Sequence, residues 1–64
     1  MDKESIGKKL KALRGERTLA EVANAVGISI SAIQMYECGE RVPRDEIKIK
    51  LAEYYGVSIE SIFF

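Results

Sequence analysis

One side of a short predicted helix carries side chains of the types that contact the edges of base pairs. Ser29 is a good N-cap for this helix, which ends before Gly39. Its inward side is expected to hold Ile33, Tyr36 and Glu37. The opposite, exposed side holds polar and apolar residues: Ile30, Ser31, Gln34 and Met35. A glutamine amide can bond adenine at two points, and apolar side chains contact the methyl group of thymine.

These four residues also have simpler interpretations. Gln34 can be a hydrated surface residue, although contact with a base is favoured. Ser31 can bond almost any base or a phosphate, so its contact carries little information about DNA sequence. Ile30 and Met35 are large and apolar for exposed positions, and either thymine methyl groups or a partner protein can cover them.

The spacing of apolar residues before this helix predicts a second helix that crosses it. Its inward residues recur at i, i+3, i+4 and i+7: Leu19, Val22, Ala23 and Val26. Ala23 leaves room for the crossing helix, and Gly27 can adopt the positive φ that a sharp helix end needs. Ile28 is expected to follow as a buried residue. Two crossed helices joined by a Gly-containing turn, over residues 18–37, predict a helix-turn-helix.

The rest of the chain also has helical periodicity, and no stretch alternates like a strand. A helix over 3–14 has Asp2 or Ser5 as a cap and Gly15 as its end, and Thr18 caps the next one, which ends near Ala25. The apolar face of the first helix is Ile6, Leu10 and Leu13. Pro43 is expected in the first turn of a fourth helix that ends at Gly56, and Ser58 caps a short fifth one. The buried stripe of the fourth helix is Ile47, Leu51 and Tyr54 or Tyr55. We therefore expect an all-α, compact five-helix bundle forming one domain over residues 1–64.

Composition excludes several classes of function. The chain has 64 residues, one cysteine and no histidine, which leaves no internal disulfide and no complete metal site. No nucleophile has an evident base, so an enzyme is not expected, and no cofactor is implied. Apolar runs are too short for a membrane span or a signal peptide, which predicts a reducing cytosol.

Charge is balanced and unevenly placed. The chain contains ten Lys and Arg residues and ten Asp and Glu residues, which gives a formal net charge of zero. Residues 18–40 contain no Lys or Arg, while cations lie on both sides: in the first helix and at Arg17, and then at Arg41, Arg44, Lys48 and Lys50. Few phosphate contacts per subunit predict a shallow salt dependence, so useful affinity would need two subunits on two half-sites.

Three stretches carry a resemblance to a known family. They are TLAEVANAVG at 18–27, SISAIQMYECG at 29–39 and the run from Arg41 to Pro43, with a matching tail over 51–63. Residues 5–63 resemble the phage-repressor and Cro-type helix-turn-helix domains, the Xre-like bacterial regulators with a lambda-repressor-like fold. The resemblance implies a bacterial or phage-encoded cytoplasmic protein of the nucleoid that binds a palindromic double-stranded operator as a homodimer and acts as a repressor.

The resemblance also implies roles for individual residues. Base-reading positions correspond to Ile30, Ser31, Gln34 and Met35, and phosphate contacts to Thr18, Ser29, Arg41 and Arg44. Arg14 would pair with Glu37 and tie the first helix to the third. This chain departs from the family at Leu19, where Gln is usual, and at Cys38, where Asn is frequent. The connection over 15–17 is about two residues shorter than usual.

Two further interpretations stay open. Aromatic and apolar residues near the C-terminal end can serve the core or a dimer interface: Tyr55, Ile59, Ile62, Phe63 and Phe64. Lys8 and Lys11 can be a hydrated helix face or flank a DNA backbone. The alternative function is an antitoxin or adaptor module that uses the same fold mainly to grip a partner protein.

Overall fold

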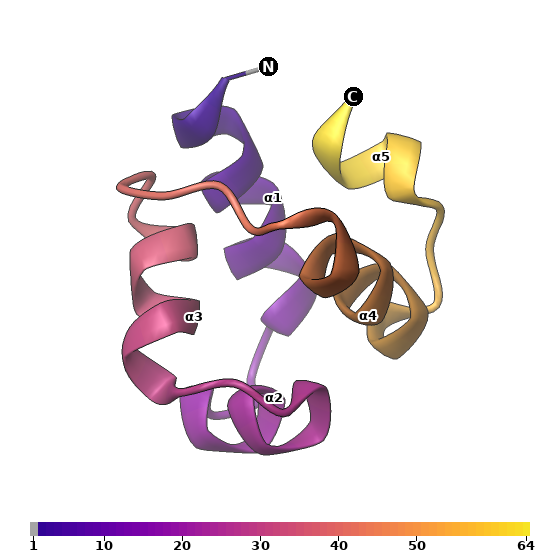
Figure 1. Ribbon diagram of the computed structural model, residues 1–64. Helices are drawn as coiled ribbons and strands as arrows, with labels where there is room; N and C mark the ends of the chain where they lie inside the picture. Colours follow the sequence, from indigo (N-terminus) through magenta and orange to yellow (C-terminus); the bar gives the residue numbers. More distant parts are fainter. Residues whose placement is uncertain (1) are drawn as a thin grey trace.

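Polar caps and glycine stops divide the chain into helices. The computed structural model describes residues 2–64, which contain five helices and no strand. These are α1 (Lys3–Arg14), α2 (Leu19–Val26), α3 (Ile30–Glu37), α4 (Asp45–Tyr55) and α5 (Ile59–Phe63) (Figure 1). The predicted all-α, five-helix fold is confirmed.

The predicted caps form at four helix starts. Asp2 rather than Ser5 caps α1, with its Oδ1 accepting from the Glu4 amide at 3.1 Å. Thr18, Ser29 and Ser58 cap α2, α3 and α5 through their hydroxyl oxygens. Each cap satisfies an amide that the first helical turn leaves without a partner. Local chemistry therefore sets where these helices begin.

The start of α4 differs from the prediction. Pro43 does not lie in the first turn, because the helix begins at Asp45 with Arg44 as its N-cap. Arg44 is extended, at φ −68° and ψ 163°, and Pro43 is buried in the segment before it. The end of α2 also moves slightly, to Val26 instead of Ala25. Gly27 follows with φ 84°, as the turn requires.

One hydrophobic core joins all five helices. Its buried members are Ile6, Leu10, Val22, Ala23, Val26, Ile33, Tyr36, Ile47, Leu51, Ala52, Ile62 and Phe63. On α4 the stripe is completed by Ala52, while Tyr54 and Tyr55 are only half-buried. Leu13, Leu19 and Ile28 are also half-buried and pack against the core from its edge.

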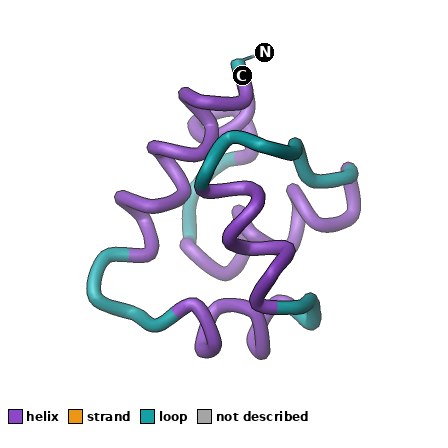
Figure 2. Tube along the Cα trace, turned by 90° about the vertical axis from the view of Figure 1, so that its left-hand side faces the viewer, coloured by secondary structure: helices purple, strands orange, loops and turns teal. Residues whose placement is uncertain are grey.

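The helix α1 separates two parts of the molecule. It packs on α3 on one side and on α5 on the other, while α2 touches α3 and α4 (Figure 1). The start of α1 and the end of α5 lie near each other, as Figure 2 shows from the side. No helix within residues 2–64 is long and apolar enough to span a membrane.

A glycine allows the close crossing of α1 and α3. A Cβ added at Gly7 would lie 2.5 Å from the Glu37 carbonyl oxygen and 2.8 Å from that of Tyr36. Backbone atoms cannot yield as a flexible side chain can, so only glycine fits here. Sequence reasoning missed this role, although a lone glycine inside a helical pattern was the available signal.

Candidate nucleic-acid interface

The outer face of α3 is open to solvent at its first turns. Ile33 and Tyr36 fix the inner face in the core, while Ile30 is 48% exposed, and Ser31 and Gln34 are also exposed. Three of the four predicted base-reading residues therefore lie on one free surface. The expected exposure of Met35 is wrong, since it is half-buried. Its carbonyl oxygen accepts from the amides of Glu40 and Arg41, because the segment after α3 folds back there.

Two shallow hollows flank Gln34 and Cys38. The first holds about 360 Å³ and lies along α3, lined by Ser31, Gln34, Met35, Cys38 and Glu40. The second holds about 190 Å³ between α3 and the neighbouring helices, lined by Lys11, Arg14, Leu19, Gln34, Glu37 and Cys38. Lys11 is thus a cation beside the candidate base reader Gln34, a placement that the sequence suggested only as one option. Leu19, which replaces the usual Gln, lines this hollow too.

Thr18 and Ser29 stand at the N-terminal ends of α2 and α3. The Oγ1 of Thr18 accepts from the Glu21 amide at 3.0 Å, and the Oγ of Ser29 accepts from the Ala32 amide at 3.1 Å. Each hydroxyl still has its own proton to donate. Helix N-termini favour anions because their free amides and dipole are positive there. Both residues are exposed and suited to a phosphate contact.

Arg41 and Arg44 supply free cations after α3. Both are exposed, and within residues 2–64 neither side chain makes an ion pair or a hydrogen bond. Arg44 is the N-cap of α4 but forms no side-chain cap bond. Their guanidinium groups are therefore available for a phosphate backbone.

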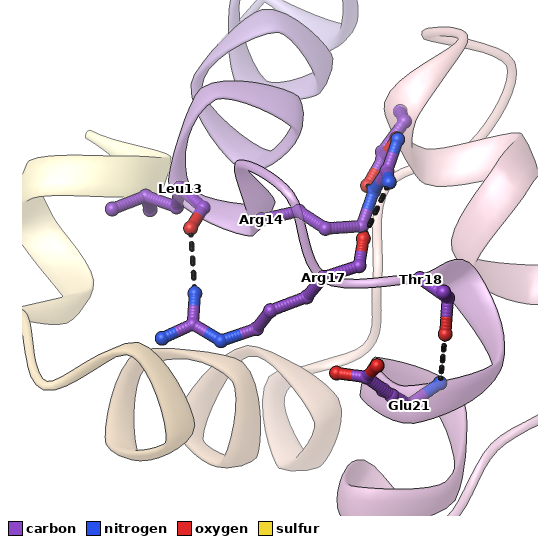
Figure 3. A network of polar contacts seen from close by, with 6 residues as sticks. Leu13, Arg14, Arg17, Thr18 and Glu21 are labelled. Carbon is purple, nitrogen blue, oxygen red and sulfur yellow. Dashed lines mark hydrogen bonds and ion pairs between the residues drawn. The ribbon is translucent and has the colours of Figure 1, made fainter.

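The structure contains the ion pair between Arg14 of α1 and Glu37 of α3. Arg14 Nε lies 2.7 Å from Glu37 Oε2, and Nη2 lies 3.0 Å from Oε1, so the contact is bidentate. The hydrogen bonds that Arg14 donates to Glu37 raise the pKa of Arg14 above its already high value. Arg14 also donates to the Arg17 carbonyl oxygen at 2.8 Å (Figure 3). The pair holds the last turn of α3 against α1 and is not free for DNA.

Arg17 is engaged within the protein instead of flanking α3 freely. Its Nη1 donates to the Leu13 carbonyl oxygen at 3.0 Å (Figure 3). Its guanidinium lies 5.5 Å from the Tyr54 ring centre and 5.6 Å from that of Tyr55. These contacts join the short α1–α2 connection to the end of α4.

Lys48 of α4 is also engaged in contacts within the protein. It lies 3.6 Å from the Asp45 carboxylate and 5.6 and 5.7 Å from the rings of Phe63 and Phe64. Of the cations expected to flank the reading helix, Arg17 and Lys48 thus serve internal contacts. Fewer positive charges are therefore free around α3 than the sequence suggested.

Burial divides the candidate dimer residues. Ile62 and Phe63 are each 1% exposed, so their assignment to a dimer surface is wrong and they belong to the core. Tyr55 and Ile59 are half-buried, whereas Phe64 is 75% exposed. Phe64 and Ile59 line a hollow of about 290 Å³ with exposed Ile49 and with Asp45 and Lys48. Ile49 was absent from the prediction because it falls outside the aromatic end of the chain.

Comparisons with known proteins agree with this geometry. A family model described as helix-turn-helix matches residues 10–62. Two cryptic phage CTXphi transcriptional repressors named RstR, from Vibrio cholerae and its serotype O1, are similar to the chain. They are 41% identical over 56 residues and 33% identical over 60 residues, covering 84% and 94% of this chain.

The relatives are longer proteins. The chain spans 50% and 52% of the two phage repressors. A protein of Pyrococcus horikoshii, named as an HTH-type transcriptional regulatory protein, is 45% identical over 51 residues, which are 77% of this chain and 16% of that protein. No solved structure matches the chain significantly.

Proposed function

The chain belongs to the helix-turn-helix family, and from this premise we propose that it is a sequence-specific DNA-binding transcriptional regulator, a repressor, that docks α3 in the major groove. The observation that carries the proposal is the free outer face of α3, where Ile30, Ser31 and Gln34 are exposed together. The names of the two phage relatives support it, since both are called transcriptional repressors. A bacterial nucleoid in the cytoplasm is the expected location for such a role.

Phosphate contacts would come from the N-terminal ends of α2 and α3 and from the segment that follows α3. Thr18 and Ser29 offer hydroxyl protons at helix N-termini, and Arg41 and Arg44 offer unpaired guanidinium groups. Lys11 adds a cation beside the hollow that contains Gln34. These few groups support specific binding with modest affinity per subunit, because phosphate contacts dominate affinity.

A homodimer would supply the remaining affinity. The exposed apolar residues Ile49 and Phe64, with half-buried Ile59, form a face on α4 and α5, and α1 lies between α5 and α3. The Cα atoms span 26 × 22 × 21 Å. Two copies joined through this face would hold their α3 helices a few tens of ångströms apart, on the scale of one DNA turn of about 34 Å.

The test of DNA binding is fluorescence anisotropy against a pool of palindromic duplexes at two salt concentrations. A preferred duplex supports the proposal, and equal binding to every duplex at low salt contradicts it. The test of the dimer is sedimentation of the wild-type chain beside Phe64→Ser, with the exposed Lys8→Ala as a control. Loss of a dimer in Phe64→Ser alone is expected, whereas a monomeric wild type rejects the homodimer.

One observation favours a second candidate, an antitoxin or adaptor that binds a partner protein. Ile30 is 48% exposed on the same face as Gln34, and an apolar side chain there also suits a protein contact. Co-purification of a partner that Ile30→Ser releases, together with no duplex preference, would establish this function instead.

A further inference from the structure

The reading surface of α3 lacks the cationic groups that most often recognise guanine. Guanine presents two acceptors in the major groove, N7 and O6, and arginine or lysine is their usual partner. Residues 18–40 contain neither. A helix that carries no cationic donor has no side chain able to make this common bidentate contact to a G·C pair.

The charged residues that border the two hollows do not change this. Glu40 lines the hollow along α3, and its carboxylate cannot donate to guanine N7 or O6. A carboxylate can accept from cytosine N4, but Glu40 lies beyond the end of α3 at Glu37 and is not on the reading helix. Arg14 and Glu37 line the other hollow but are bonded to each other. Lys11 also lines it, but it comes from α1 and not from the reading helix. Its position beside α3 suits the DNA backbone.

The groups that α3 does offer match an A·T pair. The side-chain amide of Gln34 is exposed and makes no hydrogen bond to another residue within 2–64, so its NH2 donor and its oxygen acceptor are both available. Adenine presents N7 as an acceptor and N6 as a donor, which is the complementary pattern. Ile30 is the first residue of α3 and is 48% exposed. Residues at the start of a recognition helix contact base edges, and an apolar one there suits the thymine methyl group.

We infer that α3 reads A·T pairs, with Gln34 on adenine and Ile30 on a thymine methyl group, and discriminates against G·C pairs at the contacted positions. This inference rests on the proposed DNA-binding function. Ser31 lies between these two residues in the sequence and is exposed, and its hydroxyl can bond to any base. Specificity for A·T pairs therefore depends on the side-chain amide of Gln34 and the apolar side chain of Ile30.

The experiment begins with selection of duplexes from a randomised palindromic pool by the 64-residue chain. A·T pairs are expected at the enriched, contacted positions. Each thymine of the best duplex is then replaced by deoxyuridine, which removes only the methyl group. One position of each half-site should be sensitive to this replacement. Each methyl group lost there should weaken binding about fourfold.

Variants assign the two contacts. Ile30→Ala should bind the thymine and uracil duplexes equally, while Gln34→Ala should lose about tenfold in preference for adenine over guanine at one position. Lys11→Ala is the matched control near the same hollow and should weaken binding to all duplexes alike.

The outcomes separate the inference from the function beneath it. Enrichment of no duplex overturns both. Enrichment of G·C pairs, full affinity with uracil at every position, or a loss of base preference in Lys11→Ala alone overturns the A·T readout and leaves sequence-specific binding intact.

Discussion

Arg14 and Glu37 form a bidentate ion pair between the last turn of α1 and the last turn of α3. Their side chains are 18% and 8% exposed, so the contact is largely removed from water. Guanidinium and carboxylate groups match in shape, and the planar fork fixes direction as well as distance. The pair therefore sets the orientation of α3 on the rest of the fold.

Removing one partner of this pair should destabilise the fold. Glu37→Ala leaves the Arg14 guanidinium partly buried and without its carboxylate, so the free energy of unfolding should fall by about 2 kcal/mol. Urea denaturation measures the change, with exposed Glu53→Ala on α4 as the matched control. Equal stability of Glu37→Ala and Glu53→Ala would show that the pair is energetically neutral.

Gly7→Ala should destabilise the fold, although it adds only one methyl group. The added methyl group would meet the carbonyl oxygens of Glu37 and Tyr36 at 2.5 and 2.8 Å, so α1 and α3 must move apart. We expect a loss of at least about 2 kcal/mol in unfolding free energy. Lys8→Ala, at the adjacent exposed position, should change stability by less than about 0.5 kcal/mol. A Gly7→Ala variant as stable as Lys8→Ala would contradict the close crossing.

Local signals explain why much of the fold was predictable. A side-chain cap and a following glycine act within one turn of helix, so Thr18, Ser29 and Ser58 could be identified from neighbours alone. The start of α4 could not be predicted in the same way, because Pro43 is compatible with both a first helical turn and the extended segment before one.

Long-range contacts explain what the sequence could not show. The stripe positions of α3 correctly placed Ile30, Ser31 and Gln34 outward, but the chain after α3 folds over Met35. Arg17 resembles a free cation in the sequence, yet distant aromatic residues of α4 engage it. In the sequence, Ile62 and Phe63 cannot be distinguished from exposed apolar residues near a chain end. The packing of α5 on α1 buries them in the structure.

Stability should decline at alkaline pH because of Tyr55. Burial, with smaller effects of Glu37 and Tyr54, raises the pKa of Tyr55 from about 10 to about 12. The neutral phenol is favoured in the folded state, so its contribution is complete below pH 10 and is lost as the pH rises to about 12. Solvent screens this half-buried ring, and the expected loss is about 1 kcal/mol.

The Tyr55→Phe variant isolates this effect. Urea denaturation between pH 9 and 12 should show a smaller decline for Tyr55→Phe than for the wild type, on the order of the screened shift. Tyr54→Phe, which removes the hydroxyl of the neighbouring ring, is the matched control. An identical decline in the wild type and Tyr55→Phe would assign the alkaline loss to other groups.

The salt dependence of DNA binding should reveal both the phosphate contacts and the number of subunits. Arg41 and Arg44 are exposed, and Arg44 makes no cap bond, so Arg44→Ala should leave α4 intact. Each lost phosphate contact lowers the slope of log affinity against log salt by about 0.9. A homodimer loses two contacts per substitution, so the slope should fall by about 1.8 in Arg41→Ala or Arg44→Ala.

Lys9→Ala is the control for this measurement. Lys9 lines a hollow with Ile62 and Phe63 on the α5 side, so its loss should leave the wild-type slope unchanged. A decrease of about 0.9 would indicate one bound subunit, and an unchanged slope in both arginine variants would remove these residues from the interface.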